Sequence, residues 1–211
     1  MKEDRITFNC GKLRLEGILS VPEGVGPFPA VVVCHPHPLY GGDMYNNVVS
    51  VVSVALVQAS IVALRFNFRG VGGSQGEYGG GIGEQEDVEA AISYVATRDK
   101  VDAARIGLAG YSAGAGFSML VGCKDKRVKA LAAISPPLAM FDFECLKGCA
   151  KPKILVCGER DDFTPVDRFT EFCQSLSDPK EFATIAGVDH FWWGRESEVA
   201  DRVAGFFVEA L

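Results

Sequence analysis

The sequence predicts an α/β fold in which a mostly parallel sheet of about eight strands carries helices on both faces. The short, continuous apolar run over residues 30–34 is typical of a strand that is buried on both faces, and 128–134 is a further strand of the buried type. Segments with one apolar helical face lie between these runs, so strand and helix alternate along the chain. No linker or internal repeat interrupts the alternation, and we therefore expect residues 1–211 to form one domain.

The first half of the chain is expected to begin with an antiparallel hairpin. Residues 5–21 alternate apolar and polar side chains about a turn at Gly11 and Lys12, which is the pattern of two half-buried strands. In chain order, the elements expected next are a strand over 30–34, a helix over 46–60, a strand over 61–66, a glycine-rich loop over 70–83 and a helix over 84–98. The last helix has acidic residues in its first turn, where the helix dipole favours them.

The second half of the chain continues the alternation. In chain order, we expect a strand over 105–109, a helix near 117–121, strands over 128–134 and 153–157, a helix over 166–176, a strand over 182–185 and a closing helix over 199–207. Because helices separate the successive buried strands, the connections are crossovers and the strands they join are parallel.

The composition indicates a globular protein with a sizeable core, since 48% of the residues are hydrophobic and 23% are charged. A net charge of -6, with no cluster of lysine and arginine, argues against a nucleic-acid partner. Serine and glutamine interrupt the longest apolar stretch, around 48–64, and the start of the chain lacks an apolar signal core. We therefore expect neither a membrane span nor a secretory segment. The seven scattered cysteines fit reduced thiols, and we expect a cytoplasmic protein.

The strongest chemical signal is the G-x-S-x-G motif over residues 110–114, where a buried strand ends and a helix of small residues begins. In a nucleophile elbow, the serine takes a strained backbone conformation that points its hydroxyl out of the sheet. The residues two positions away on either side must then be very small, and here they are Gly110 and Gly114. The motif therefore predicts Ser112 as a nucleophile.

A serine hydroxyl needs a base to take its proton, and that base needs an acid to orient it. The chain has three histidines, and His190 lies in a loop after the last expected strand. The acid should follow the strand between nucleophile and base, where the loop over 158–165 holds Asp161 and Asp162. Asp189, next to His190, is expected to be a loop residue instead. The order serine, aspartate, histidine is the one found in α/β hydrolases.

On these motifs the chain resembles the α/β-hydrolase superfamily and, within it, the small cap-less group that includes dienelactone-hydrolase-like esterases. The resemblance spans nearly the whole chain, and it is carried by His35-Pro36-His37-Pro38 with Gly41-Gly42, Arg69-Gly70 with Gly73-Ser74, the 110–114 elbow, the 158–165 loop and the His190 loop. It implies that the acid is Asp161, three residues after the loop glycine, with Asp162 as the alternative. Dienelactone hydrolases proper have cysteine at the elbow, so that activity is not expected here.

The oxyanion formed in acyl transfer needs two backbone N–H donors. One is expected from Ala113, directly after the nucleophile. The resemblance implies that the other comes from His37, in the loop after the 30–34 strand. The prolines on either side of His37 have no N–H, so Leu39 and Tyr40 are the alternatives.

Several other motifs were weighed against this interpretation. His35 and His37 have the spacing of a metal pair, but a metal site needs further ligands and His190 is better used as the base. We therefore expect no metal and no cofactor. The glycine-rich loop over 70–83 lacks the phosphate-binding patterns, so it is expected to be a flexible turn, and Arg69 is expected to form a structural ion pair. Of the adjacent Trp192 and Trp193, one is expected to line the pocket and the other to lie on the surface.

The sequence thus predicts a serine hydrolase that cleaves small carboxylic esters through an acyl-enzyme. Thioesterase, peptidase or acyltransferase activity on the same residues, and a non-catalytic binding role, are the alternatives. The stretch where related hydrolases insert a cap, 136–151, has only sixteen residues, so we expect no cap and a shallow pocket for short acids. The side chains expected to line its mouth are aromatic: Tyr40, Phe141, Phe163 and Trp192. The sequence does not predict the oligomeric state.

Overall fold

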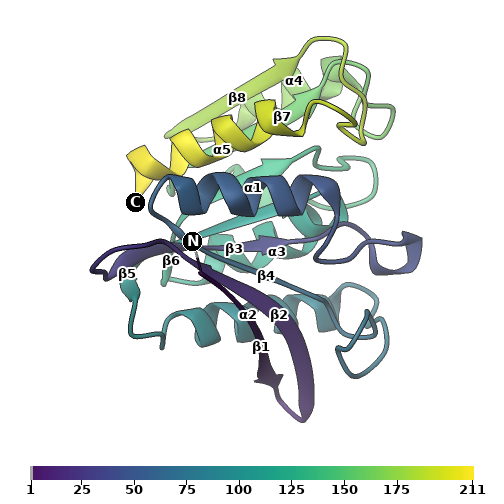
Figure 1. The fold of residues 1–211 in the computed structure, drawn as a ribbon. Coiled ribbons are helices and arrows are strands. Elements are labelled where there is room, and N and C mark those ends of the chain that lie inside the picture. The colour runs from purple at the N-terminus through teal and green to yellow at the C-terminus, as the bar shows by residue number, and fades with distance from the viewer. Residues whose placement is uncertain (1) are drawn as a thin grey trace.

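The computed structural model describes residues 2–211, which form one eight-stranded sheet with the strand order β1-β2-β4-β3-β5-β6-β7-β8 (Figure 1). The strands are β1 Lys2–Cys10, β2 Leu13–Val21, β3 Phe28–Cys34, β4 Val62–Phe66, β5 Val101–Tyr111, β6 Val128–Ile134, β7 Lys153–Gly158 and β8 Lys180–Ile185. The helices are α1 Asn47–Gln58, α2 Ile82–Val95, α3 Ala113–Lys124, α4 Val166–Ser175 and α5 Glu196–Ala210, with single 3-10 turns η1 Pro38–Tyr40 and η2 Glu144–Leu146.

The predicted α/β architecture is confirmed. The opening hairpin pairs β1 with β2 about Gly11, with Cys10 opposite Leu13, and β2 also pairs antiparallel with β4. All the other neighbours, from β4 through β3 and β5 to β8, are parallel. The parallel strands are joined by crossovers, because a chain that leaves one end of the sheet must return to the other end. Helices α1, α2, α3 and α4 lie in these crossovers, except that the one between β6 and β7 holds only the turn η2.

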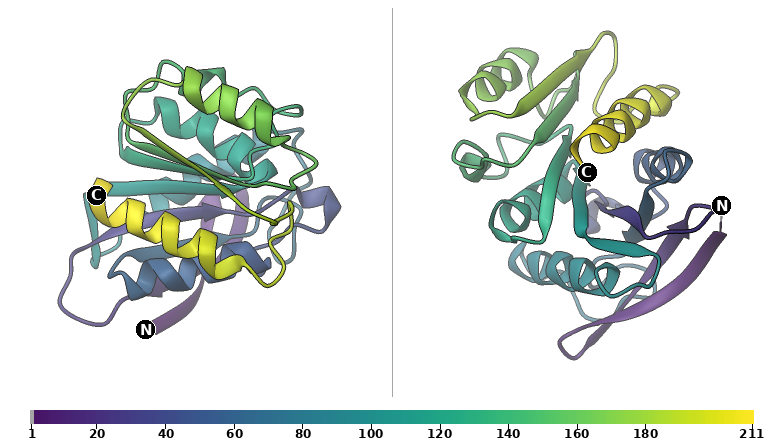
Figure 2. Two further views of the ribbon diagram at one scale, coloured as in Figure 1. Left: turned by 90° about the horizontal axis from the view of Figure 1, so that it is seen from above. Right: turned by 90° about the vertical axis from the view of Figure 1, so that its left-hand side faces the viewer.

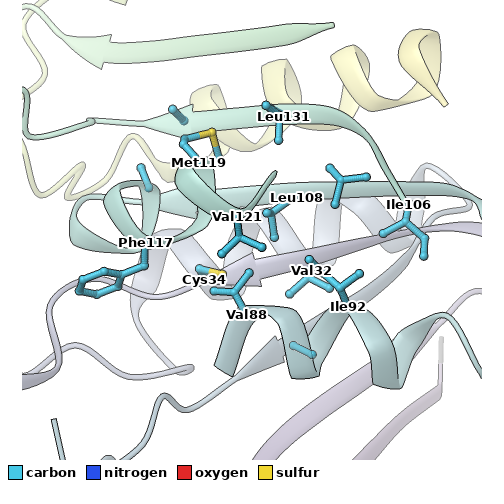
Figure 3. Close-up of a cluster of buried hydrophobic side chains, with 14 of the residues drawn as sticks. Val32, Cys34, Val88, Ile92, Ile106, Leu108, Phe117, Met119, Val121 and Leu131 are labelled. Atoms are coloured by element: carbon cyan, nitrogen blue, oxygen red, sulfur yellow. The ribbon is translucent and has the colours of Figure 1, made fainter. Parts of the chain in front are cut away.

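Helices cover both faces of the sheet and give the molecule three layers. Helices α1 and α5 lie on one face, and α2, α3 and α4 lie on the other (Figure 2). Strand β3 serves both layers: Val32 packs on the side of α2 and α3, whereas Val31 and Val33 face α1 and α5. Figure 3 shows the first of these cores, with Val32 beside side chains of α2 and α3. Burial on both faces explains why these strands are continuous apolar runs.

The structure sharpens several element boundaries. Helix α2 begins at Ile82, two residues before the start expected from the sequence. The Glu84 carboxylate accepts the N–H groups of Gly79 and Gly81, and these hydrogen bonds cap the first turn. Between β6 and β7, the stretch expected to lack a cap holds only the single turn η2. Among residues 2–211, every helix is too short or too polar to cross a membrane.

Candidate active site

The loops that follow the parallel strands gather at one end of the sheet, where the strands' carboxyl ends meet (Figure 1). Ser112 follows β5, Asp161 follows β7 and His190 follows β8. His37 follows β3, which lies directly beside β5. The topology therefore brings together residues that lie up to 153 positions apart in the sequence, since 190 − 37 = 153.

Ser112 occupies a strained turn between β5 and α3. Its backbone has φ 55° and ψ -125°, a left-handed conformation that is costly for a residue with a side chain. The serine N–H donates to the carbonyl of Ile134 on the neighbouring strand at 2.9 Å, which holds the turn in place. A Cβ atom on Gly114 would overlap the backbone of Cys34 and His35, so only glycine lets α3 start this close to the end of β3.

Three side chains form a continuous chain of hydrogen bonds. The Nε2 atom of His190 lies 2.9 Å from the Oγ atom of Ser112, and its Nδ1 atom lies 2.9 Å from both carboxylate oxygens of Asp161. A carboxylate only accepts hydrogen bonds, so Nδ1 carries the proton and Nε2 is free to accept from the serine hydroxyl. The imidazole is thus held in the tautomer that a base needs.

The structure distinguishes between the two neighbouring aspartates of the 158–165 loop. Asp161 is 3% exposed, and its Oδ1 atom accepts the N–H groups of Phe163 and Thr164 at 3.0 and 3.1 Å. The Thr164 hydroxyl donates to the Pro136 carbonyl at 2.6 Å and fastens this loop to the end of β6. Asp162 is exposed to solvent and makes no hydrogen bond or ion pair with residues 2–211. Of the two carboxylates, only that of Asp161 contacts His190.

The loop that carries His190 is held by Asp189 and by Tyr111, which no sequence motif had indicated. The Tyr111 hydroxyl donates to the His190 carbonyl at 2.6 Å, and burial raises the pKa of this hydroxyl, which keeps it a donor. Asp189 accepts the N–H groups of Phe191 and Trp192 at 2.9 and 3.2 Å, so it shapes the loop, as expected. Tyr111 occupies the variable position before the elbow serine, and no local pattern points to its partner 79 residues away.

One pocket prediction is wrong, because Trp192 does not line the cleft. Its side chain is 0% exposed and packs in the core beneath α1 and α5, where its indole N–H donates to the Ser135 hydroxyl at 3.0 Å. The backbone at Trp192 has φ 62°, and this left-handed turn sends its ring inward. Phe191, which is 51% exposed, lines the cleft in its place, and Trp193 lies on the surface at 72% exposed.

The cleft above Ser112 has a volume of about 410 Å³. Of the side chains expected at its mouth, Tyr40, Phe141 and Phe163 do line it. The ring of Phe141 lies directly on Gly116 of α3, where a Cβ atom would overlap it. Met140 and Phe191 also border the cleft, which makes its walls largely apolar and aromatic.

The backbone donors near Ser112 differ in whether they are already engaged. The N–H of Leu39 donates to the Nδ1 atom of His37 at 3.2 Å, and the N–H of Tyr40 donates to the His37 carbonyl at 3.1 Å. The N–H groups of Ala113 and His37 have no partner among the described residues, and both residues line the cleft. Only these two of the four candidate donors are free to bind an oxyanion.

His35 has a structural role in the same loop region. Its Nε2 atom accepts the N–H of Phe68 at 3.1 Å, and its Nδ1 atom lies 2.6 Å from the Pro36 carbonyl, so both ring nitrogens are engaged. Burial lowers its pKa to about 4, which keeps the ring neutral. His35 therefore ties the end of β3 to the loop after β4. Within residues 2–211, no group of three or more histidine, cysteine or acidic side chains is arranged to hold a metal ion.

Arg69 is likewise a structural residue. Its guanidinium contacts the fully buried carboxylate of Asp87 at 2.8 to 3.1 Å and that of Glu86 at 2.9 Å. Hydrogen bonding to Asp87 raises the pKa of the guanidinium. This pair anchors the loop before α2 to the helix itself, and Arg69 does not reach the cleft.

Comparison with known proteins assigns the family of this chain. Residues 11–169 match the family described as X-Pro dipeptidyl-peptidase (S15 family). The chain belongs to the S15 family. The match includes Ser112 and Asp161, whereas His190 follows it. An uncharacterized protein from Rickettsia prowazekii is 31% identical to this S15-family chain over an alignment of 212 positions. The alignment covers 97% of this chain and 88% of that protein.

Solved structures similar to this S15-family chain are α/β serine hydrolases. An α/β serine hydrolase homologue from Coxiella burnetii matches with a TM-score of 0.88 at 35% identity and covers 97% of both chains. A member of the α/β serine hydrolases without a lid, from Xanthomonas campestris, matches with a TM-score of 0.83 at 26% identity, over 99% of this chain and 94% of that one. The resemblance to cap-less α/β hydrolases is confirmed.

Proposed function

We propose that this member of the S15 family hydrolyses small carboxylic esters with Ser112 as nucleophile, His190 as general base and Asp161 as the orienting acid. The observation that carries the proposal is the hydrogen-bond chain from Ser112 through His190 to a buried carboxylate. Such a chain activates a weak nucleophile without a cofactor. The free thiols throughout residues 2–211 support our further proposal that the enzyme works in the cytoplasm.

The first half of the reaction forms an acyl-enzyme. His190 takes the proton of Ser112 at Nε2 while Oγ attacks the ester carbonyl, and Asp161 stabilises the imidazolium that results. The free N–H groups of Ala113 and His37 then bind the oxyanion. Each such donor typically lowers the barrier by about 2.7–4 kcal/mol.

The second half of the reaction releases the acid. His190 passes its proton to the departing alcohol oxygen, so its Nε2 atom becomes a base again. A water molecule that enters the open cleft gives a proton to Nε2 and attacks the acyl carbonyl. The second tetrahedral oxyanion uses the same two N–H groups. It collapses to the free acid as the bond to Oγ of Ser112 breaks, and Nε2 of His190 returns its proton to that oxygen.

Labelling with a fluorophosphonate probe tests whether the site is catalytic. We expect a single adduct on Ser112, because the probe reacts with a serine only where a base and an oxyanion site activate it. Mass spectrometry of the labelled chain locates the adduct. No reaction at Ser112, under conditions in which a known serine esterase is labelled, would favour a non-catalytic binding protein.

The size of the cleft predicts a preference for short acids. The cleft has a volume of about 410 Å³, and the stretch between β6 and β7 adds only a single turn and no cap, so methylenes beyond the reach of the cleft stay hydrated. Such methylenes contribute well below the roughly 0.8 kcal/mol of a fully buried one. Among p-nitrophenyl esters from acetate to palmitate, we expect kcat/KM to be highest for acids of two to six carbons. A steady rise through the longest acids would contradict a shallow cleft.

Peptidase activity is the second candidate function, and the family match favours it because the S15 family is described by an X-Pro dipeptidyl-peptidase. His190 and Asp161 would play the same roles, but Ser112 would take its acyl group from a peptide amide instead of an ester. A comparison of kcat/KM for p-nitrophenyl acetate and for Gly-Pro p-nitroanilide separates the two candidates. A higher value for the dipeptide would replace the esterase proposal with the peptidase.

A further inference from the structure

A second hollow adjoins the cleft at Ser112 and has the same volume of about 410 Å³. The two hollows share His37, Met140 and Phe141 as lining residues, so these side chains form the wall between them. Phe141 is held in that wall by its contact with Gly116, whereas Met140 is 56% exposed and has room to move. The second hollow contains none of the three residues of the hydrogen-bond chain, and the proposed reaction does not use it.

Several polar groups in the second hollow have hydrogen-bonding capacity to spare. The Nδ1 atom of His37 accepts from Leu39, so in the neutral ring the proton is on Nε2, which has no partner among residues 2–211. Gln85 uses its amide N–H to cap the Gly81 carbonyl at 3.0 Å and leaves its Oε1 atom unpaired. These groups offer one donor and one acceptor in the lining of the hollow.

Asp142 and Tyr78 add to this set. One carboxylate oxygen of Asp142 accepts the N–H of Glu144 at 2.8 Å, and the other makes no hydrogen bond with the described residues. The Tyr78 hydroxyl is also without a hydrogen-bond partner there. Asp142 is the only charged residue that lines the hollow. An anionic ligand group would therefore meet a negative charge with no cation to offset it.

The position of the hollow indicates which part of a substrate reaches it. The departing alcohol must lie against Nε2 of His190, which returns its proton, and His190 follows β8. The second hollow is lined mainly by the loop before α2, the start of α2 and by α3. The loop before α2 follows β4, and in the strand order β4 and β8 lie on opposite sides of β5, at whose end Ser112 stands. A substrate whose alcohol faces His190 therefore directs its acyl part toward His37 and the second hollow.

We propose that the second hollow binds the far end of the acyl group and selects a polar, uncharged end that donates hydrogen bonds, such as a carboxamide. The inference rests on the proposed function. The N–H groups of a carboxamide match the free oxygens of Gln85 and Asp142, and its carbonyl matches the Nε2–H of His37. A terminal methyl makes no hydrogen bond with these groups, and a terminal carboxylate is repelled by Asp142.

The test uses p-nitrophenyl esters of straight-chain acids of four to eight carbons that end in methyl, carboxamide or carboxylate. At the length that spans the wall, we expect kcat/KM for the carboxamide to exceed that for the methyl ester by about tenfold, as hydrogen bonds of ordinary strength would give. The carboxylate should be the poorest of the three. Equal values at every length, in an enzyme that cleaves the acetate ester, would overturn the proposal for the second hollow and leave the proposed function intact.

Variants connect this preference to the hollow. Gln85→Leu and Asp142→Asn should each reduce the ratio of kcat/KM for the carboxamide ester to kcat/KM for the methyl ester by about threefold or more. The ratio is used because both values come from the same variant, so a general loss of activity cancels. Gln174→Leu and Asp167→Asn, both on α4, are the matched controls and should keep the wild-type ratio. An unchanged ratio in both test variants would overturn the assignment.

A second ester series distinguishes the acyl side from the alcohol side. Phenyl acetates that carry the same three end groups on the alcohol part place the polar end near His190 instead. We expect these esters to show no preference for the carboxamide. If the preference appeared here and not in the acyl series, the second hollow would bind the alcohol part and the proposed direction would be wrong.

Discussion

Ser112→Ala is expected to lower kcat toward small esters by roughly five to six orders of magnitude. The remaining activity would come from the oxyanion donors and from binding in the cleft. The variant should fold, because within residues 2–211 the Ser112 side chain hydrogen-bonds to His190 alone. Steady-state kinetics measure the loss, and thermal melting checks that the fold is kept.

Ser175→Ala provides the matched control, since Ser175 is an exposed serine at the end of α4, far from the cleft. It should retain wild-type kcat. Near wild-type turnover by the Ser112→Ala variant would exclude Ser112 as the nucleophile, and with it the mechanism.

Asp161→Asn is expected to lower kcat by about four orders of magnitude. The Oδ1 atom of Asp161 accepts the N–H groups of Phe163 and Thr164, so the oxygen of an asparagine amide would stay there. The amide nitrogen would then face Nδ1 of His190 and donate to it. This forces the ring proton onto Nε2, which can no longer accept the proton of Ser112.

Asp162→Asn is the control for this prediction, because it makes the same chemical change one residue away on an exposed side chain. Its kcat should stay within about twofold of wild type, as expected for a surface substitution. If Asp162→Asn proved the more damaging of the two, the orienting acid would be Asp162 and the arrangement around His190 would have to differ from that described.

The architecture could be predicted from the sequence because its signals are local. A strand such as β6 is buried on both faces and reads as an apolar run that only the exposed Lys129 interrupts, and its limits match the expected 128–134. The sequence pattern predicts a helix only near 117–121, four residues after α3 begins at Ala113, because the first turn of α3 consists of small residues that carry no apolar pattern. Those residues are small because the strand ends and Phe141 lie against them, and this contact is tertiary.

The site could be predicted only in part. Ser112 can be predicted because it stands in a motif whose geometry depends on its nearest neighbours in the sequence. His190 can be predicted as the base because the chain has only three histidines to choose from. The choice of Asp161 over Asp162 required a resemblance, because the distinguishing feature is which carboxylate the loop turns toward His190. The inward turn of Trp192 has no sequence signal either, since it depends on the hydrogen bonds that Asp189 makes to the following backbone.

The strand order leaves two open sheet edges, at β1 and at β8. An open edge presents unpaired N–H and C=O groups to any other chain that offers a strand. Charged side chains occupy both edges: Lys2, Glu3, Asp4 and Arg5 stand along β1, and Lys180 and Glu181 begin β8. Two molecules that joined their sheets edge to edge would have to bring these charges together and partly strip them of water. Aggregation by strand pairing is thereby disfavoured in a protein that has a free edge at each end of a long sheet.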